Sequence, residues 1–92
     1  MDYHNLNKLL REDVATVTFT KKDGTKRQMI CTLLEQFLPE MNSTENKVPN
    51  TDSMTVWDLE QSAWRAFRMD SLISIETDTM LFNIESNSFT YV

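Results

Sequence analysis

Residues 54–75 read MTVWDLEQSAWRAFRMDSLISI, and this stretch decides the expected fold. Two runs rich in β-branched and aromatic residues flank a short polar segment at residues 60–63, and a third such run follows. Nearly all the large apolar side chains in the middle of the chain lie here. The pattern predicts a β-hairpin that nucleates a small β-barrel and leaves one face for a partner.

A register for this hairpin follows if residues 60–63 form its loop and Leu59 stands opposite Trp64. One face then turns toward the core, and its cross-strand pairs are Val56 with Phe67, Met54 with Met69 and Asp58 with Arg65. Arg65 and Arg68 are three residues apart, so a regular strand sends them to opposite faces unless a bulge intervenes. In a regular strand Arg65 is structural, and Arg68 is the better candidate for binding an anion.

The opposite face of the hairpin carries Trp57 and Trp64 with Arg68 beside them. Two interpretations of this face stay open. The indoles can form the seat of an N-terminal helix. Alternatively, they stack on a ligand while Arg68 holds its phosphate or carboxylate group.

The N-terminal third of the chain predicts a short helix followed by a hairpin. Residues 3–11 place apolar side chains at helical spacing behind Asp2, the expected N-cap. Residues 13–20 alternate between apolar and threonine positions, as in a half-buried antiparallel strand, and residues 27–34 form its partner. Gly24, the single glycine of the chain, marks the turn because glycine accepts a positive φ. The expected core positions of this hairpin are Ala15, Val17, Phe19, Met29, Cys31 and Leu33.

The remaining segments predict irregular structure and a C-terminal extension. Pro39 limits any helix just before it to about one turn, and the polar residues 42–53 predict an exposed loop. Residues 78–92 contain two apolar runs that can form a second hairpin or pair with the barrel edge. If the chain itself does not cover this extension, we expect a homodimer to form through its aromatic side chains, Phe82, Phe89 and Tyr91.

Composition predicts one ordinary globular domain, residues 1–92, with 40% hydrophobic and 25% charged residues. The single cysteine, Cys31, cannot form an internal disulfide, which favours a reducing compartment. The N-terminus does not resemble a signal peptide, and no apolar run reaches the roughly 18 residues of a membrane span. We therefore expect a cytoplasmic protein without membrane association.

Charge is distributed unevenly along the chain, whose formal net charge is −5. Four basic residues gather around Asp23, namely Lys21, Lys22, Lys26 and Arg27, whereas every charged residue from Asp70 onward is acidic. An acidic protein is an unusual nucleic-acid binder. This uneven charge suits head-to-tail association or a small anionic ligand at least as well as it suits DNA binding. The simplest interpretation is two solvated surfaces.

The sequence contains no recognisable set of catalytic residues. His4 is the single histidine, and the sequence shows no Cys–His or Ser–His–Asp set. Cys31 is expected to be a small buried hydrophobe. Metal-spaced clusters and glycine-rich phosphate loops are also missing from the sequence. We expect a protein that is not an enzyme and uses neither a cofactor nor a metal.

The run VWDLEQSAWRAFRMDSLISI, preceded by VTFTKKDGTKRQMICTL, resembles the WYL-type module. Its closing hairpin has the form aromatic, acid, turn and Trp-Arg-x-Phe-Arg-x-Asp-x-Ile. The most specific match here is the run Trp64-Arg65-x-Phe67-Arg68, followed by Asp70 and Ile73. The resemblance covers roughly residues 13–76 and extends to the short stand-alone WYL-like proteins of large tailed phages. It implies an SH3-like or Sm-like barrel of about five strands, which agrees with the strand pattern, with the N-terminal helix and residues 78–92 outside the barrel.

The resemblance also implies a function. WYL modules are usually joined to helix-turn-helix domains and act as ligand-sensing or nucleic-acid-contacting regulatory parts, with basic residues facing the ligand. Arg65 and Arg68 match those positions here, although the chain has no helix-turn-helix region and is acidic. The candidate ligand-binding residues are therefore Arg68, Arg65, Trp64, Trp57, Lys21, Lys22, Lys26 and Arg27.

Two functional hypotheses result. The first is a regulatory module that contacts nucleic acid or a nucleotide-like anionic ligand, with affinity that falls steeply with salt. The second is a phage-type inhibitor, located in the host cytoplasm, that binds a host regulatory or defence protein and uses its acidic surface as a nucleic-acid mimic. They are distinguished by whether the basic residues are accessible.

Overall fold

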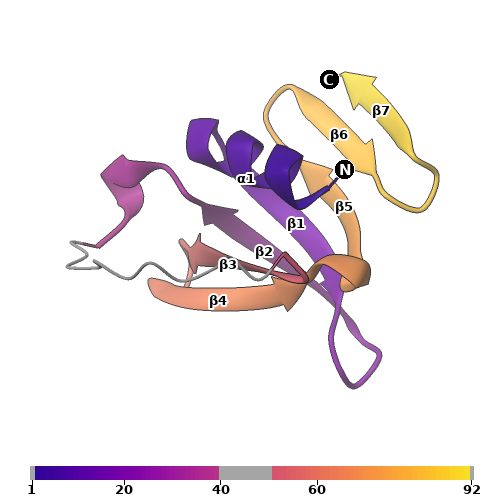
Figure 1. The fold of residues 1–92 in the computed structure, drawn as a ribbon, viewed down its shortest axis with the longest axis horizontal. Helices are drawn as coiled ribbons and strands as arrows, with labels where there is room; N and C mark the ends of the chain where they lie inside the picture. The colour runs from indigo at the N-terminus through magenta and orange to yellow at the C-terminus, as the bar shows by residue number, and fades with distance from the viewer. Residues whose placement is uncertain (1, 40–50, 92) are drawn as a thin grey trace.

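The computed structural model describes residues 2–39 and 51–91, which form one antiparallel sheet with a helix packed on it (Figure 1). The seven strands follow the order β4-β3-β2-β1-β5-β6-β7. The elements are α1 (Tyr3–Glu12), β1 (Val14–Thr20), β2 (Lys26–Thr32), η1 (Glu35–Phe37), β3 (Ser53–Asp58), β4 (Ala63–Arg68), η2 (Met69–Ser71), β5 (Leu72–Glu76), β6 (Met80–Asn83) and β7 (Ser88–Tyr91). The predicted mainly β fold, with five strands, an N-terminal helix and a C-terminal hairpin, is confirmed.

Strands β1 and β2 form the predicted hairpin. Ala15 stands opposite Cys31 and Val17 opposite Met29, so the alternate apolar positions share the core face. Gly24 in the turn has φ of 89°, and its N–H donates to the carbonyl oxygen of Lys21 at 2.9 Å. The chain therefore reverses where the Asp-Gly pair predicts it.

The β3–β4 hairpin has a register that differs by two residues from the predicted one. Trp57 stands opposite Trp64 and Asp58 opposite Ala63, so the loop covers residues 59–62. The cause is the carboxylate of Asp58, whose Oδ1 accepts the backbone N–H groups of residues 60 and 61 at 2.9 and 3.1 Å. These bonds close the turn directly after Asp58.

A slip of two residues leaves every side chain of the hairpin on its predicted face, because the side-chain period of a strand is two. Met54 and Val56 still face the core with Phe67, and all three are buried. The predicted pair between Asp58 and Arg65 is wrong, since Arg65 now stands opposite Val56. The basic partner of Asp58 is Arg27 of β2, at 3.6 Å.

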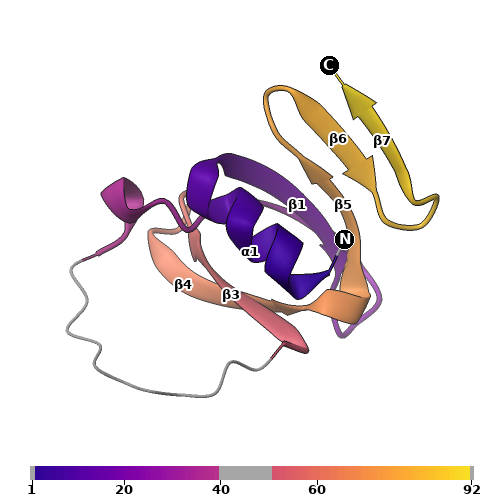
Figure 2. The same ribbon diagram turned by 45° about the horizontal axis from the view of Figure 1, so that its top comes forward.

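Helix α1 lies between β1 and the β3–β4 hairpin on the core side of the sheet (Figure 2). Asp2 is its N-cap, as predicted, and accepts the N–H of Asn5 at 2.8 Å. Leu6 and Leu10 are fully buried in the main hydrophobic cluster together with residues of β1 to β5. The interpretation of the indole face as the seat of the helix is therefore wrong, because the helix occupies the opposite, apolar face of the hairpin.

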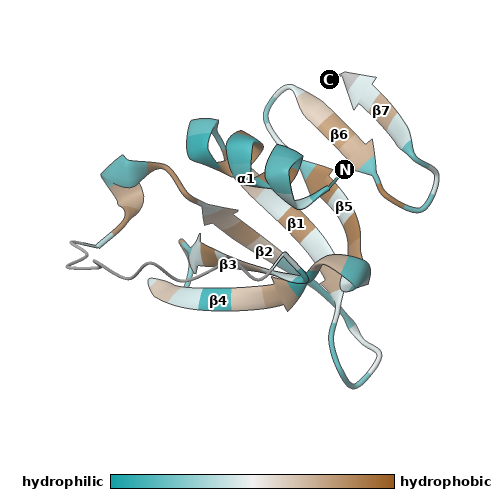
Figure 3. Cartoon of the chain, in the orientation of Figure 1, coloured by the Kyte–Doolittle hydropathy of each residue, from teal (hydrophilic) through white to brown (hydrophobic). Residues whose placement is uncertain are grey.

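The C-terminal extension forms a hairpin that lengthens the sheet beyond β5. Strand β6 pairs with β5 through Ile75 and Phe82, and β7 then pairs with β6 (Figure 3). The Phe82 ring is buried and lies 4.3 Å from the ring of Phe89, which is 52% exposed. The chain thus covers Phe82 itself, and the homodimer stays a prediction that rests on Phe89 and the free edge of β7.

The segment after β2 follows the prediction as far as the structure describes it. Residues Glu35–Phe37 form a single 3₁₀ turn just before Pro39. The predicted loop over residues 42–53 lies largely outside the described residues, and β3 already begins at Ser53. Among the described residues, no helix is long and apolar enough to cross a membrane.

Candidate functional site

A cleft of about 1000 Å³ opens where the β1–β2 turn, the end of β4, η2 and the β6–β7 turn approach one another. It brings together residues that are far apart in the sequence. Its charged lining consists of Lys21, Lys22, Asp23, Arg68, Asp70 and Glu85. Its apolar lining consists of Phe19, Ala66, Phe67, Leu72, Ile73 and Ile84.

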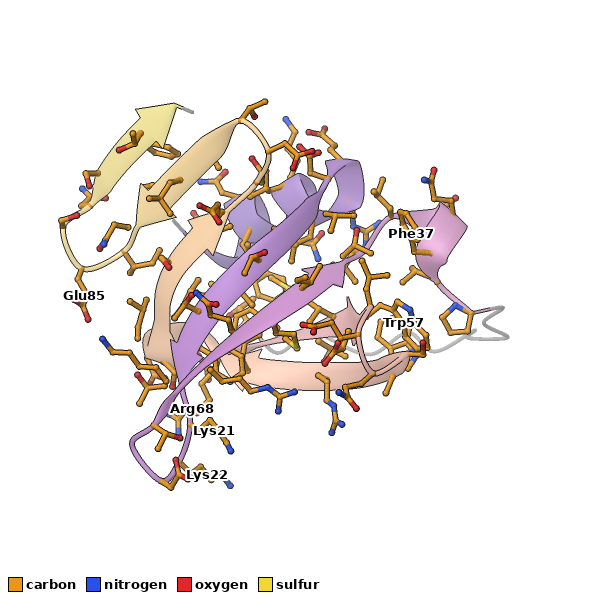
Figure 4. The ribbon with its side chains drawn as sticks, turned by 180° about the vertical axis from the view of Figure 1, so that it is seen from behind. Lys21, Lys22, Phe37, Trp57, Arg68 and Glu85 are labelled. Carbon is orange, nitrogen blue, oxygen red and sulfur yellow. The ribbon has the colours of Figure 1, made fainter. Side chains whose placement is uncertain are left out.

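Three cations line this cleft, and all three are predicted site residues. Lys21 and Lys22 come from the β1–β2 turn, and Arg68 comes from the last position of β4. Figure 4 shows the three side chains close together at one end of the molecule. The topology therefore brings the β1–β2 turn and the end of the central hairpin to the same cleft.

The turn that carries the two lysines is held by local hydrogen bonds. The N–H of Lys21 donates to the Thr25 carbonyl oxygen at 2.7 Å. Asp23 Oδ1 accepts both the Thr25 hydroxyl at 2.6 Å and the Thr25 N–H at 3.0 Å. These two hydrogen bonds, assisted by the charge of Lys21, lower the pKa of Asp23. An ionised Asp23 therefore stays within the basic turn.

Arg68 is accessible although it has an ionic partner. Its Nη2 lies 3.1 Å from Oδ2 of Asp70, and the two side chains are 71% and 68% exposed. An ion pair as exposed as this one is worth about 0–1 kcal/mol and exchanges readily for a stronger partner. The guanidinium can therefore turn to a phosphate or carboxylate group, which it binds with two parallel hydrogen bonds.

The floor of the cleft is aromatic and aliphatic. The rings of Phe19 and Phe67 stack at a centroid distance of 5.5 Å and an interplanar angle of 20°. Ile73 and Ile84, one from β5 and one from the β6–β7 turn, add apolar surface, and the N–H of Ile84 donates to the carbonyl oxygen of Ile73 at 2.8 Å. An apolar floor beside a few charged groups is typical of small-ligand sites.

The other predicted site residues lie elsewhere. Trp57 and Trp64 contact each other edge to face at 5.3 Å on the outer face of the hairpin, and Figure 4 shows Trp57 far from Arg68. Arg65 is exposed on the other face of β4 from Arg68, since the β3–β4 pairing is regular throughout. The predicted residues therefore do not form a single site.

Lys26 and Arg27 also stay outside the lining of the cleft. Lys26 begins β2, is exposed and stands opposite Thr20. Arg27 turns instead toward the buried carboxylate of Asp58, which makes it structural. The Arg27 side chain is 38% exposed, so it adds positive potential at the surface although its guanidinium is paired with Asp58.

The floor and the acidic side of the cleft were not predicted. The sequence pattern places Phe19 and Phe67 in the core, and it places Ile84 and Glu85 in the C-terminal extension. The sequence signal that could have found Phe19 is its place two residues before Lys21, at the end of a strand. No local signal places Ile84 and Glu85 here, because their approach depends on the β5–β6 pairing.

Cys31 is excluded as a reactive group by its surroundings. Burial, and secondarily the negative charge of Asp58 opposite it on β3, raises the pKa of the thiol to about 12. A thiol with this pKa is protonated at neutral pH and is a poor nucleophile. Within residues 2–39 and 51–91, no three side chains of His, Cys, Asp or Glu are grouped so that they could hold a metal ion.

Comparison with known proteins agrees with this fold. Residues 3–73 match the family described as WYL_2, with an Sm-like SH3 β-barrel fold, and the matched range includes α1. The chain is 42% identical over 66 residues to an uncharacterized 11.5 kDa protein in the Gp31-cd intergenic region of Enterobacteria phage T4. The alignment covers 67% of this chain and 65% of that relative. No solved structure matches the chain. Because the family match spans well over half of the sequence, the protein belongs to the WYL_2 family of Sm-like SH3 β-barrels.

Proposed function

We propose that this protein is a small, non-enzymatic binding module whose cleft holds a nucleotide-like anionic ligand or a phosphate group of a nucleic acid. The observation that carries the proposal is that Lys21, Lys22 and Arg68 line one cleft together with the apolar side chains of Phe19, Ile73 and Ile84. The cations suit a phosphate, and the apolar floor suits the base attached to it.

The chemistry of the three cations supports an anion. Arg68 offers a planar fork of N–H donors that matches two oxygens of a phosphate, and the lysines act as mobile point charges. Arg68 is 71% exposed, and the C-terminal extension borders the cleft through Ile84 and Glu85 without covering this side chain. The accessibility that separates a ligand-binding module from an inhibitor with a covered basic end therefore favours the module.

The test compares two arginines of one strand. Fluorescence anisotropy with labelled nucleotides and short DNA and RNA at low salt measures binding by the wild type, Arg68→Ala and Arg65→Ala. We expect Arg68→Ala to weaken binding by about tenfold or more, the usual effect of losing a charge-assisted hydrogen bond. Arg65→Ala is the matched control and should change affinity by less than about twofold, because only long-range charge is lost.

Two results would contradict the proposal. The first is the absence of binding to every probe at low salt. The second is an equal loss in both variants, which would show that net charge and not the cleft governs binding. The stacking role predicted for Trp57 and Trp64 stays a separate prediction, and Trp64→Ala tests it in the same assay because these indoles lie away from the cleft.

A second candidate function is inhibition of a host regulatory or defence protein by an acidic surface that mimics nucleic acid. Two observations favour it. The relative that is 42% identical over 66 residues is a protein of Enterobacteria phage T4. In addition, Asp70, Glu76, Asp78 and Glu85 are the charged residues after Arg68, and they belong to η2, β5 and the turns beside β6, at one side of the sheet.

The second candidate is tested by a pull-down from host lysate with wild type and a Glu76→Gln/Asp78→Asn variant. If the protein is an inhibitor of this kind, we expect the wild type to retain a specific host protein and the neutralised variant to retain none. Competing DNA should release the host protein from the wild type. Retention of that protein by both forms would show that the acidic surface is not the contact.

A further inference from the structure

The three cations of the cleft are confined to one of its walls. Lys21 and Lys22 project from the β1–β2 turn and Arg68 from the end of β4. The β6–β7 turn supplies Glu85 to the other side, and Figure 4 shows Glu85 separated from the three labelled cations. The positive surface is thus a short patch and not a continuous track.

Carboxylates balance these cations within the cleft. Asp23, Asp70 and Glu85 line it together with the three basic residues, so the lining is neutral as a whole. The lining offers no cation beyond these three, so a second phosphate would meet carboxylates that repel it. A groove that tracks a single strand needs positive charge over several nucleotides.

Within residues 2–39 and 51–91, the surfaces next to the cleft do not extend the positive patch. Toward β5, β6 and β7 the chain carries no basic residue at all, because none follows Arg68 in the sequence. In the other direction Arg27 is paired with Asp58, and Arg65 lies on the other face of β4. Among the residues that the structure describes beside the turn, this leaves Lys26, opposite Thr20.

We infer that the ligand of the cleft is a compact nucleotide with a single phosphate group, a nucleoside monophosphate, and not a continuous nucleic-acid strand. The inference rests on the proposed function and narrows its ligand class. The phosphate binds Arg68 and the two lysines, and the base lies on the half-buried apolar side chains of Phe19, Ile73 and Ile84. Asp70 and Glu85, which would repel further phosphates, accept hydrogen bonds from ribose hydroxyl or base amino groups.

The experiment is a competition series by isothermal titration calorimetry on the full chain. The probes are the four ribonucleoside monophosphates and single strands of two, four, eight and twelve nucleotides, with the eight-nucleotide strand made with and without a 5′ phosphate. We expect at least one monophosphate to bind, and strands to bind no tighter per molecule as they lengthen. The salt dependence should also stay independent of length, whereas a tracked strand adds a slope of about 0.7 per neutralised phosphate.

A charge reversal makes the inference sharper. Glu85→Lys extends the positive patch to the other side of the cleft, so it should improve strand binding more than monophosphate binding. Lys22→Ala should weaken the monophosphate and leave the difference between short and long strands unchanged.

The outcomes distinguish failure of the single-phosphate inference from failure of the proposed function. Affinity that rises more than about tenfold from two to twelve nucleotides, with a salt slope that grows alongside, overturns the inference and leaves the proposed function standing. Binding of the eight-nucleotide strand that requires its 5′ phosphate supports the single-phosphate site and identifies a strand end as a second source of the same group. Absence of binding to every probe overturns the proposed function and the inference together.

Discussion

Arg27 and Asp58 form an ion pair between β2 and β3, with the guanidinium Nη2 3.6 Å from Oδ2 of a carboxylate whose side chain is 2% exposed. The other carboxylate oxygen, Oδ1, accepts the N–H groups of residues 60 and 61. One buried side chain therefore links the barrel wall to the turn that sets the β3–β4 register. A buried carboxylate is tolerated only when hydrogen bonds and a cation compensate its lost hydration.

The turn should lose stability when this carboxylate is removed. Asp58→Ala leaves two N–H groups without their acceptor, and we expect a loss of about 2–3 kcal/mol in the free energy of unfolding. Asp58→Asn keeps an acceptor oxygen and should lose less. Arg27→Ala should cost about 1–2 kcal/mol, below the usual range for a buried pair because Arg27 is 38% exposed and partly screened by water. Urea unfolding followed by tryptophan fluorescence measures each value.

Arg65→Ala is the control for this series, since Arg65 is exposed and should change stability by less than about 0.5 kcal/mol. A loss from Arg65→Ala equal to that from Arg27→Ala would contradict the assignment of Arg27 as the partner of Asp58.

Cys31 should make the protein less stable in alkaline solution. The folded state keeps the thiol protonated up to a pKa of about 12, because burial and the charge of Asp58 disfavour the thiolate. The unfolded chain releases the same proton at its ordinary pKa near 8.5. Above this pH the unfolded state binds fewer protons, so the free energy of unfolding falls by up to about 1.4 kcal/mol per pH unit until the folded thiol also titrates.

Urea midpoints measured from about pH 8 to about pH 10.5 give this slope, because the interval begins just below the pKa of the unfolded thiol. Cys31→Ala lacks the thiol and should show a shallower fall, because the two proteins are otherwise identical. Parallel pH profiles for the two proteins would show that the thiol does not contribute.

Gly24 should be sensitive to substitution because of its backbone and not because of its surroundings. Its φ is 89°, and a Cβ added here would meet no atom within 4 Å. The cost of Gly24→Ala is therefore backbone strain, about 1–2 kcal/mol. Gly24→Asn should cost less, because asparagine tolerates positive φ better than alanine does. Chemical denaturation ranks the three proteins, and equal stability of the alanine and glycine forms would rule out strain at this turn.

The free edge of β7 should support self-association. Of the two sheet edges, β4 carries Arg65 and Arg68, which oppose pairing with another chain, whereas β7 has no charged residue and exposes Phe89. We expect the apparent mass in sedimentation velocity to rise with protein concentration, and Phe89→Lys to abolish the rise.

Ile30→Lys tests whether exposed apolar area alone explains this association, because Ile30 is also exposed but lies on β2 in the middle of the sheet. The prediction fails if Ile30→Lys has the same effect or if the wild-type mass does not depend on concentration. Thermal unfolding of both variants verifies that the fold is retained.

The elements themselves follow from local patterns. Helical spacing behind Asp2, strict alternation through β1 and the turn at Gly24 each depend on residues close in sequence, and each appears where predicted. The faces of the β3–β4 hairpin were also predictable, because strand periodicity survives a slip of two residues. The exact register was not, since it depends on which backbone groups Asp58 accepts.

The candidate site was predictable only in part, because contacts between residues far apart in the sequence assemble it. The basic character of Lys21, Lys22 and Arg68 is visible in the sequence, and so is the separation of Arg68 from Arg65 by a regular strand. Only tertiary structure brings the β6–β7 turn to the same cleft as Lys21, Lys22 and Arg68, and only tertiary structure pairs Arg27 with Asp58. Local periodicity thus determined the strands and their faces, while long-range strand pairing and the burial of one carboxylate decided which of the basic residues share a cleft.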